Sequence, residues 1–437
     1  MVVKPMVTYL LGKNIQVSVA TRTKTKADAI IGNHYLGRAI AWTMDDEKSL
    51  NKMIADHDLT VSLLPWGYHP VVAGYCLRHK KNMITTSYVK PEMKMLDKQA
   101  MEADIIILNE LGLDPGIDHM SAMRIIDNVH NRNGKIDGFY SVCGALPSPE
   151  AAEKPFKYKF SWSPKGVIMA GNNEGKFLKD NRIIMVPSED LFKNTLKIDF
   201  PGVGILEVYP NRDSLPYVNL YGIPETKTMI RGTFRYPGWC EIMNAMKQLR
   251  LMSNDKKDFS GKSFAEFMSI MISEDNTSKI KEKVAAHLGL EIGSLPVEAM
   301  DWLGLFEDRA MNRNIDSAFD IVSDLMIEKM MLGENESDMV AMQHIFLASW
   351  PDGKKEVIKS SMLEFGSPAT STSIARTVAL PAAIGVEMIL NKMIKAKGVH
   401  IPVIPEIYNP ILDRLESMDI QMIEEYGLNE NEFFKLM

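Results

Sequence analysis

The first 110 residues alternate short apolar runs with amphipathic stretches, in the order strand, helix, strand. Strands that alternate with helices form parallel sheets, because each helix crosses back over the sheet before the next strand begins. The pattern therefore predicts an α/β domain with a parallel sheet. Its strands are expected at residues 15–21, 39–42, 58–65, 82–86 and 104–109, and its helices at residues 24–34, 45–57, 68–80 and from Pro91 onward.

The pattern changes in the second part of the chain. Residues 241–333 carry long helical patterns joined by short polar links, which predicts an all-helical insert. Residues 339–349 and 355–363 flank Asp352-Gly353, a dipeptide that favours the tight turn of a β-hairpin. The other elements predicted here are a strand at residues 135–143 and helices near residues 373–397 and 410–424.

Composition and charge narrow the classes of partner. The chain has 437 residues, 46% of them hydrophobic, and a net charge of −6, which argues against nucleic acid or an anionic membrane as the main partner. The cysteines, at positions 76, 143 and 240, match no zinc spacing and no closed set of disulfides, so we expect no metal and a reducing, cytoplasmic compartment. Because Pro381 and Glu387 interrupt the most apolar stretch, no membrane span is expected.

Polar residues follow the predicted strands, at the edge where an open parallel sheet binds ligands. Thr21-Arg22-Thr23 follows the first strand. An arginine between hydroxyls favours the 2′-phosphate of NADP over the free ribose of NAD, although a solvated turn has the same residues. Residues 85–88 follow a later strand, and their hydroxyls either contact a ribose or substrate carboxylate or satisfy the backbone of a turn.

The richest loop covers residues 109–119 and combines two glycines, a proline and three carboxylates between a strand and a helix. Asp114 is the candidate for the ligand cleft. Asp118 is explained equally well as a helix cap, and His119 as a structural histidine. Further along, two arginine-bearing turns at residues 209–214 and 231–236 suit a substrate with several carboxylates, since guanidinium binds carboxylate bidentately. Surface ion pairing is the alternative.

Five strings resemble the L-glutamate-forming saccharopine dehydrogenase family, also called the saccharopine reductase family. They are LNELGLDPGIDHM (108–120), CGALPSPE (143–150), YKFSWSPKGV (158–167), YPNRDS (209–214) and RGTFRY (231–236). The resemblance covers nearly the whole chain. It implies an NAD(P)-dependent oxidoreductase of lysine metabolism that reversibly converts saccharopine, oxidised cofactor and water into L-glutamate, 2-aminoadipate 6-semialdehyde and reduced cofactor. NADP is the expected cofactor, with NAD as the alternative, and a homodimer is the expected assembly.

The resemblance also implies three domains and a set of site residues. The domains are a Rossmann-type dinucleotide-binding domain (residues 1–117 and 372–437), an α/β substrate and dimerisation domain (118–236 and 337–371) and a small helical domain (237–336). Cofactor contacts fall on Thr21, Arg22, Thr23, Leu64, Thr86, Leu113, Asp114, Pro115 and Ser163. Substrate contacts fall on Ser87, Tyr88, Asp114, Arg212, Thr233, Phe234 and Arg235. Tyr88, Asp114 and Cys143 are expected near the reacting nitrogen, where proton transfers are needed.

Two other functions fit the same pattern. One is a carboxynorspermidine-type dehydrogenase, whose substrate has fewer carboxylates, so that a need for both Arg212 and Arg235 separates the two enzymes. The other is a truncated, non-catalytic paralogue that serves assembly or regulation. Hydride transfer from NADPH would exclude this second alternative.

The start of the chain departs from the family pattern. A dinucleotide-binding unit should begin with a strand and a G-x-G-x-x-G turn, whereas residues 2–11 already read as a helix. The only G-x-G is Gly202-Val203-Gly204, which lies far downstream and lacks a third glycine. We therefore expect the first strand and the glycine turn to precede Met1, and the 437-residue chain to fold poorly and bind NADPH weakly or not at all.

Overall fold

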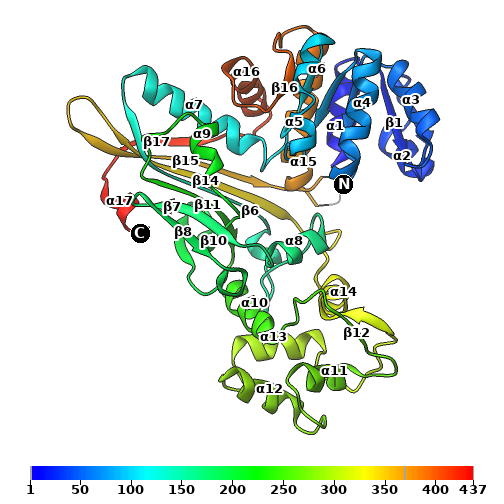
Figure 1. The fold of residues 1–437 in the computed structure, drawn as a ribbon, viewed down its shortest axis with the longest axis vertical. Helices are drawn as coiled ribbons and strands as arrows, with labels where there is room; N and C mark the ends of the chain where they lie inside the picture. The colour runs from blue at the N-terminus through cyan, green and yellow to red at the C-terminus, as the bar shows by residue number, and fades with distance from the viewer. Residues whose placement is uncertain (1, 369–370, 437) are drawn as a thin grey trace. The chain divides into compact units, whose positions relative to one another are not determined.

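The protein, seen here as a computed structural model, is described over residues 2–368 and 371–436. The chain divides into two compact units (Figure 1). Unit 1 contains Met1–Lys135, Trp350–Asp352 and Ser360–Glu425. Unit 2 contains Ile136–Ser349, Gly353–Lys359 and Tyr426–Met437. The three-domain division implied by the resemblance stays a prediction.

Unit 1 is built from short parallel strands with helices around them (Figure 1). The strands are β1 (Val17–Thr21), β2 (Gly37–Ala41), β3 (Leu59–Ser62), β4 (Asn82–Thr85), β5 (Ile106–Leu108) and β16 (Gly398–His400). The helices are α1 (Val3–Gly12), α2 (Lys24–Ile31), α3 (Glu47–Ala55), α4 (His69–His79), α5 (Pro91–Lys94), α6 (Asp97–Glu102), α7 (Ile117–Asn131), α15 (Ser373–Leu390) and α16 (Pro405–Glu416), with the 3-10 turn η1 (Trp66–Tyr68).

The predicted parallel α/β arrangement is confirmed in unit 1. Strands β3, β4, β5 and β16 form one sheet in the order β16-β5-β4-β3, and each neighbouring pair is parallel. Strand β5 is buried throughout, as expected of a strand covered on both faces. Strands β1 and β2 form a second parallel sheet, which is not hydrogen-bonded to the first within the described residues. The expectation of a glycine turn before Met1 is not tested by the structure and stays a prediction.

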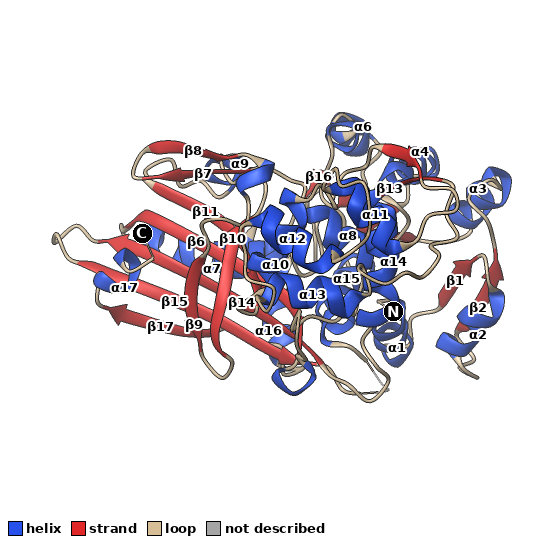
Figure 2. Ribbon diagram, turned by 90° about the horizontal axis from the view of Figure 1, so that it is seen from below, coloured by secondary structure: helices blue, strands red, loops and turns tan. Residues whose placement is uncertain are grey.

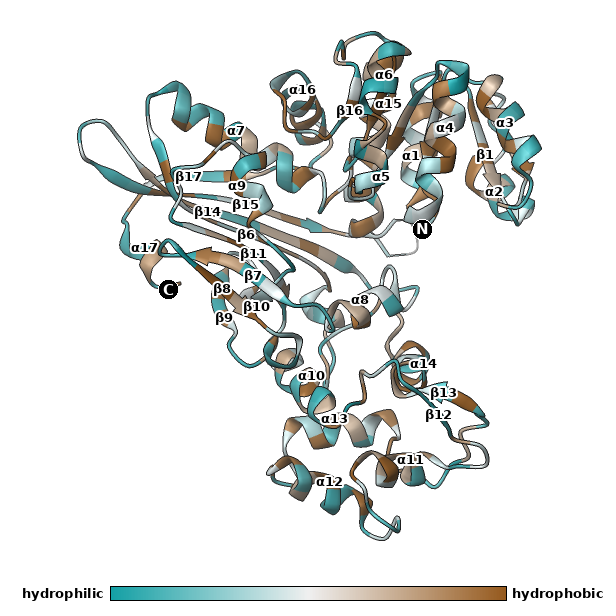
Figure 3. Ribbon diagram, in the orientation of Figure 1, coloured by the Kyte–Doolittle hydropathy of each residue, from teal (hydrophilic) through white to brown (hydrophobic). Residues whose placement is uncertain are grey.

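Helix α15 corrects one expectation from the sequence. Despite Pro381 and Glu387, its 18 residues, Ser373–Leu390, have a mean hydropathy of 1.5, which is apolar enough to span a membrane. Figure 3 colours the residues of α15 by their hydropathy. However, 83% of this window is buried inside the protein, where α15 packs against α1, so the helix belongs to the core. Tyr9 donates a hydrogen bond to Glu387, and Arg414 Nη1 lies 2.7 Å from the same carboxylate, so the acidic side chain is paired.

Unit 2 is dominated by a large mixed β-sheet, in which some neighbouring strands are antiparallel and others parallel (Figure 2). The strands are β6 (Lys135–Pro147), β7 (Gly175–Lys179), β8 (Arg182–Val186), β9 (Leu196–Phe200), β10 (Gly204–Pro210), β11 (Thr228–Arg235), β12 (Lys256–Asp258), β13 (Ile315–Ser317), β14 (Asp338–Ser349), β15 (Lys355–Phe365) and β17 (Ile423–Leu428). The helices are α8 (Pro164–Ala170), α9 (Pro216–Leu220), α10 (Trp239–Gln248), α11 (Phe264–Met271), α12 (Ile280–Leu288), α13 (Leu295–Leu303), α14 (Ala318–Met330) and α17 (Asn431–Phe434), with the 3-10 turns η2 (Pro149–Ala151) and η3 (Ser188–Asp190).

The main sheet of unit 2 has nine strands, in the order β17-β15-β14-β6-β11-β10-β9, with β7 and β8 attached through β11. The boundary with unit 1 runs through β15 and β17. Neighbouring strands β14 and β15 flank residues 352 and 353, as the turn signal predicted. Strand β11 runs parallel to β6 and antiparallel to β10, which fixes the neighbours of every residue from Thr228 to Arg235.

Three predicted elements were wrong in part. The insert at residues 241–333 is mostly helical, but β12 and β13 pair in it as a short antiparallel ladder. The helix expected over residues 373–397 ends at Leu390 and is followed by β16. The helix expected over residues 410–424 ends at Glu416, and β17 forms after it as an edge strand of the large sheet.

Candidate functional site

The predicted cofactor residues Thr21, Arg22 and Thr23 stand at the carboxyl end of β1. Thr21 is the last residue of the strand, and the side chains of Arg22 and Thr23 are exposed. Arg22 has no ion-pair partner among the residues that the structure describes. A guanidinium between two hydroxyls is chemically able to bind a phosphate, and the cofactor role of this loop stays a prediction.

The loop after β4 meets the loop after β5 through a direct side-chain contact. Tyr88 Oη donates a hydrogen bond to Asp114 Oδ1 at 2.7 Å. Both side chains are only partly buried, so the pair can be reached from outside the core. The structure therefore brings together two of the three residues predicted to lie near the reacting nitrogen.

Close backbone packing holds the Asp114 loop against Thr86. A side-chain carbon added at Gly112 would lie 3.3 Å from Thr86 Cβ, so these two residues adjoin. Gly116 has φ +146°, and a carbon added there would lie 2.0 Å from the carbonyl oxygen of Gly112, so only glycine fits. Leu113 and Pro115 are buried within this loop, and the Asp114–Pro115 peptide is cis.

Asp118 and His119 are structural, as the sequence suggested. Asp118 Oδ1 accepts the N–H of Gly116 at 2.6 Å, at the beginning of α7. His119 is fully buried, and its Nε2 lies 2.8 Å from Oε2 of Glu110. Leu64, another predicted cofactor contact, follows β3 and is half-buried.

A buried histidine beneath the Ser87 loop was not predicted. His69, the first residue of α4, is 2% exposed. Its Nδ1 lies 2.9 Å from Ser62 Oγ, and its Nε2 lies 2.9 Å from Ser87 Oγ. Burial lowers the pKa of His69, which favours the neutral imidazole. No sequence motif marks this residue, because its partners come from the ends of two different strands.

Unit 2 places three other predicted residues on neighbouring strands. Cys143 of β6 pairs with Thr233 of β11 in parallel register, so their side chains share one face of the sheet. Arg235 lies two residues after Thr233 and faces the same way. Phe234 faces the opposite way and is fully buried, with its ring 5.5 Å from that of Phe200. The role of Phe234 in substrate binding stays a prediction.

The guanidinium of Arg235 lies buried in an aromatic cage. Its side chain is 4% exposed, and its Cζ lies 5.0 Å from the ring of Tyr158 and 5.6 Å from the rings of Tyr209 and Trp239. Burial raises the pKa of both phenols, so they stay neutral and do not balance the charge. The Nη1 group donates to the Phe234 carbonyl at 2.7 Å, whereas Nε has no hydrogen-bond partner within the described residues.

A carboxylate stands near this cage without pairing to it. Glu207 lies directly opposite Arg235 in the antiparallel ladder, but no ion pair joins the two among the described residues. Glu207 Oε1 instead accepts a long hydrogen bond, at 3.4 Å, from the N–H of Gly238. Among the described residues, no carboxylate therefore forms an ion pair with the Arg235 guanidinium.

The remaining two predicted residues, Arg212 and Ser163, are exposed. Arg212 follows β10 with φ +55°, and its carbonyl accepts the N–H of Lys176 at 2.8 Å. Ser163 precedes α8 as its N-cap residue, but its side chain accepts no capping hydrogen bond. Both side chains are therefore accessible, and their predicted ligand contacts remain predictions.

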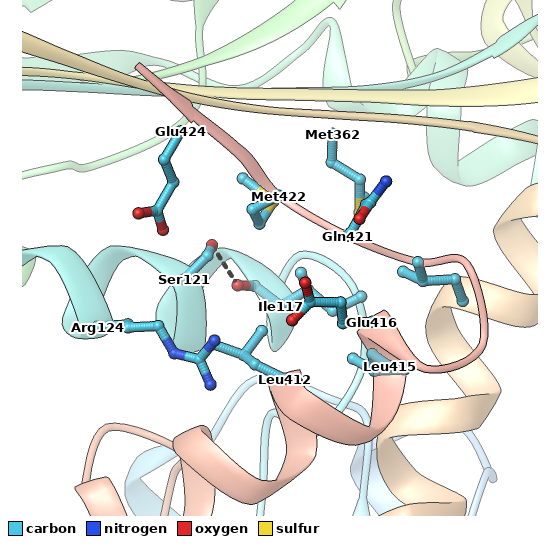
Figure 4. A pocket seen from close by; sticks show the side chains of 11 residues that line it. Ile117, Ser121, Arg124, Met362, Leu412, Leu415, Glu416, Gln421, Met422 and Glu424 are labelled. Atoms are coloured by element: carbon cyan, nitrogen blue, oxygen red, sulfur yellow. Dashed lines mark hydrogen bonds between the residues drawn. The ribbon is translucent and has the colours of Figure 1, made fainter. Parts of the chain in front are cut away.

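Two cavities within the units do not coincide with the predicted residues. A cavity of about 40 Å³ lies between α7 and α16, and Ser121, Arg124 and Glu416 contribute polar groups to its lining (Figure 4). This volume holds a water molecule or two rather than an amino-acid substrate.

A second cavity, of about 160 Å³, is lined by Arg309, Arg313 and neighbouring residues of the helical part of unit 2. Arg313 is already paired with Asp316 and Asp324. Over the described ranges, no group of three or more His, Cys, Asp or Glu side chains is arranged to hold a metal ion.

Comparisons with known proteins agree with these features. A family model described as the saccharopine dehydrogenase NADP binding domain matches residues 2–108, and one described as the saccharopine dehydrogenase C-terminal domain matches residues 112–420. The chain is 36% identical to the saccharopine dehydrogenase [NADP(+), L-glutamate-forming] of Saccharomyces cerevisiae over 98% of this chain and 96% of that protein. It is 35% identical to the mitochondrial alpha-aminoadipic semialdehyde synthase of Bos taurus, over 95% of this chain and 46% of that protein.

The fold comparison gives the same result. The apo histidine-tagged saccharopine dehydrogenase (L-Glu forming) from Saccharomyces cerevisiae superposes with a TM-score of 0.91 at 35% identity, covering 97% of each chain. The homospermidine synthase of Legionella pneumophila, in complex with NAD, has a TM-score of 0.55 at 10% identity, over 97% of this chain and 89% of that chain. This second likeness concerns the fold alone.

Proposed function

The chain belongs to the saccharopine dehydrogenase family, and we propose that it is an NADP-dependent, L-glutamate-forming saccharopine dehydrogenase. Saccharopine, oxidised cofactor and water would give L-glutamate, 2-aminoadipate 6-semialdehyde and reduced cofactor, and the reaction is reversible. The same hydride and water transfers serve either lysine synthesis or lysine breakdown.

The observation that carries this proposal is the buried guanidinium of Arg235. A buried cation without a counter-charge is unfavourable unless a ligand supplies one. Nε is left without a partner in an aromatic cage, and the planar guanidinium matches a carboxylate in shape and charge. Saccharopine carries three carboxylates, and we propose that the Arg235 guanidinium in the cage binds one of them. We propose Thr233, beside Arg235 on β11, and Arg212, which is exposed, as further substrate contacts.

The residues of unit 1 fit NADP. Arg22, free between the hydroxyls of Thr21 and Thr23, would hold the 2′-phosphate. Leu64, Thr86 and the Leu113–Pro115 segment follow parallel strands at their carboxyl ends, where such sheets bind nucleotides. Ser163 of unit 2 is also proposed as a cofactor contact. The oxidised nicotinamide supplies one capability, the acceptance of a hydride from the carbon that bears the secondary amine of the substrate.

Tyr88 and Asp114 are proposed to transfer the protons that hydrolysis of the imine requires. Loss of hydride converts the secondary amine into an imine, and water must then add to this imine and lose a proton before the C–N bond breaks. Asp114 Oδ1 accepts a hydrogen bond from the Tyr88 hydroxyl, which orients the carboxylate for its proposed role as a proton acceptor. Ser87, next to Tyr88, would bind substrate. Cys143, buried on β6 beside Thr233, is a candidate to assist the proton transfers.

The test is a direct assay of the purified chain, run up to high NADP+ concentrations because the 437-residue chain is expected to bind this cofactor weakly. Saccharopine and NADP+ should produce reduced cofactor, followed by its absorbance, together with L-glutamate identified by mass spectrometry. Carboxynorspermidine as the parallel substrate and NAD+ as the parallel cofactor serve as controls. Oxidation of carboxynorspermidine in preference to saccharopine would contradict the assignment, and failure with both substrates would favour the non-catalytic alternative.

We further propose that the protein is a cytoplasmic homodimer. Ile183 and Met185 are 59% and 65% exposed on the edge strand β8, and such apolar surface is typical of an interface. Light scattering should give twice the mass of the chain, and Met185→Glu should shift the equilibrium toward the monomer if β8 contributes. A monomeric wild-type protein would contradict the dimer. The proposed cytoplasmic location is tested by cell fractionation, in which the protein should appear in the cytosolic fraction.

A further inference from the structure

Glu110 is a buried carboxylate to which the proposed reaction assigns no part. It follows β5, is 4% exposed and has φ +59°, a left-handed conformation that glutamate rarely adopts. A glycine or asparagine would adopt this backbone more easily, and an apolar side chain would avoid burying a charge. The position therefore combines two unfavourable choices, which points to a use for the carboxylate itself.

Glu110 forms hydrogen bonds to the backbone of the residues on either side of Tyr88 in the sequence. Its Oε1 accepts the N–H of Val89 at 2.8 Å, and its own N–H donates to the carbonyl of Ser87 at 3.2 Å. These two hydrogen bonds fix the backbone immediately before and after Tyr88. Glu110 thus sets where the Tyr88 side chain begins, without an interaction to the phenol itself.

The other carboxylate oxygen connects the same residue to the Asp114 loop. Oε2 lies 2.8 Å from His119 Nε2, and a carboxylate only accepts, so this nitrogen carries the proton. His119 stands in the first turn of α7, directly after the loop, and Asp118 beside it binds the N–H of Gly116. One buried cluster therefore anchors the two loops at whose tips Tyr88 and Asp114 meet at 2.7 Å.

We propose that Glu110, supported by His119, is a positioning residue that holds the Tyr88 hydroxyl against the Asp114 carboxylate. The inference rests on the proposed function only for its effect on turnover. Its structural part, the order of residues 86–89 and 112–116, can be measured in an inactive protein. Both parts depend on the buried carboxylate of Glu110.

The turnover test is a double-mutant cycle with saccharopine and NADP+. Glu110→Ala should lower kcat roughly 10- to 100-fold, because the Tyr88–Asp114 pair loses its alignment. Glu110→Gln should lose far less, since its amide oxygen still accepts from Val89 and its amide nitrogen can donate to the other tautomer of His119. In the Tyr88→Phe background, adding Glu110→Ala should lower kcat by less than about 3-fold, because the effect of Glu110 acts through the Tyr88 hydroxyl. Equal losses in both backgrounds would overturn the proposal.

The structural test is hydrogen exchange on the same proteins without ligand. Glu110→Ala should speed amide exchange in residues 86–89 and 112–116, whereas Glu110→Gln should leave it near the wild-type rate. Glu364→Ala is the matched control: Glu364 is also buried, at 6% exposed, but it pairs with Arg376 elsewhere in unit 1. Glu364→Ala should lower the melting temperature without faster amide exchange in residues 86–89 and 112–116. Uniform acceleration in Glu110→Ala would assign Glu110 to stability alone. If the wild-type protein does not oxidise saccharopine, the proposed function fails while exchange still decides the positioning.

Discussion

Replacing Arg235 with methionine separates binding from stability in unit 2. The guanidinium is 4% exposed, with one hydrogen bond to the Phe234 carbonyl and no acidic partner among the described residues. Methionine has a similar length, and its sulfur packs well against aromatic rings such as Tyr158, Tyr209 and Trp239. The substitution should therefore remove the charge while leaving the cage filled.

The two effects have different sizes. A hydrogen bond to a charged group contributes about 1.5–3 kcal/mol, so the KM for saccharopine should rise roughly 10- to 140-fold. The unfolding free energy should change little, because the loss of the Phe234 hydrogen bond, about 1 kcal/mol, is offset by relief from burying an unbalanced cation. We expect a melting temperature equal to or above that of the wild-type protein.

Arg231 provides the matched control. It lies on the same strand, β11, is also 4% exposed and faces the same way, but its guanidinium donates to the Tyr217 hydroxyl and covers that ring at 4.2 Å. Arg231→Met should lower the melting temperature and leave the KM within about 3-fold, since it removes packing rather than a ligand contact. An unchanged KM in Arg235→Met, or equal KM increases in both variants, would refute the role assigned to the cage.

Two further predictions concern unit 1. Arg22→Glu should weaken binding of NADPH roughly tenfold or more while changing that of NADH less, because only NADPH has the 2′-phosphate; equal losses measured by titration would mean that this loop does not bind the phosphate. Burial lowers the pKa of His69, so the unfolded chain takes up a proton first as the pH falls below about 6.5, and stability is lost toward acid pH. His69→Gln should therefore show a smaller drop in melting temperature between about pH 7 and pH 5, and identical drops would contradict this reasoning.

Local patterns predicted the elements whose hydrogen bonds and buried faces are set nearby. The strands of unit 1 from β1 to β5 and the β14–β15 hairpin follow from apolar alternation and turn residues. Strand β16 could not be predicted in this way. Its three residues, Gly398–His400, pair with Ile106–Leu108, almost 300 positions earlier in the chain, and nothing in so short a segment signals a distant partner. Strand β17 is mostly exposed and acidic, so it lacks the alternation of a half-buried strand.

The same limit applies to the site. The carboxyl ends of parallel strands marked the loops that hold Arg22, Tyr88 and Asp114, and unusual residues marked the Asp114 loop, whereas the role of Tyr88 was assigned by resemblance. His69 was missed because it becomes a partner of Ser87 only when β3 and β4 lie side by side. Phe234 was assigned to the substrate by resemblance, and this contact stays a prediction; its ring points into the core because side chains alternate along β11.

Arg235 and Glu110 also explain why rules of stability alone do not find a site. A buried cation without a counter-ion and a glutamate with a left-handed backbone each lower the stability of the ligand-free fold, so selection for stability would replace them. Their presence is understandable if the first gains its partner when substrate binds and the second fixes two loops in advance. A screen for higher melting temperature should then enrich apolar residues at position 235 and glycine or asparagine at position 110, and these stabilised variants should turn over saccharopine poorly. Enrichment of fully active variants at either position would show that the native residue has no functional part.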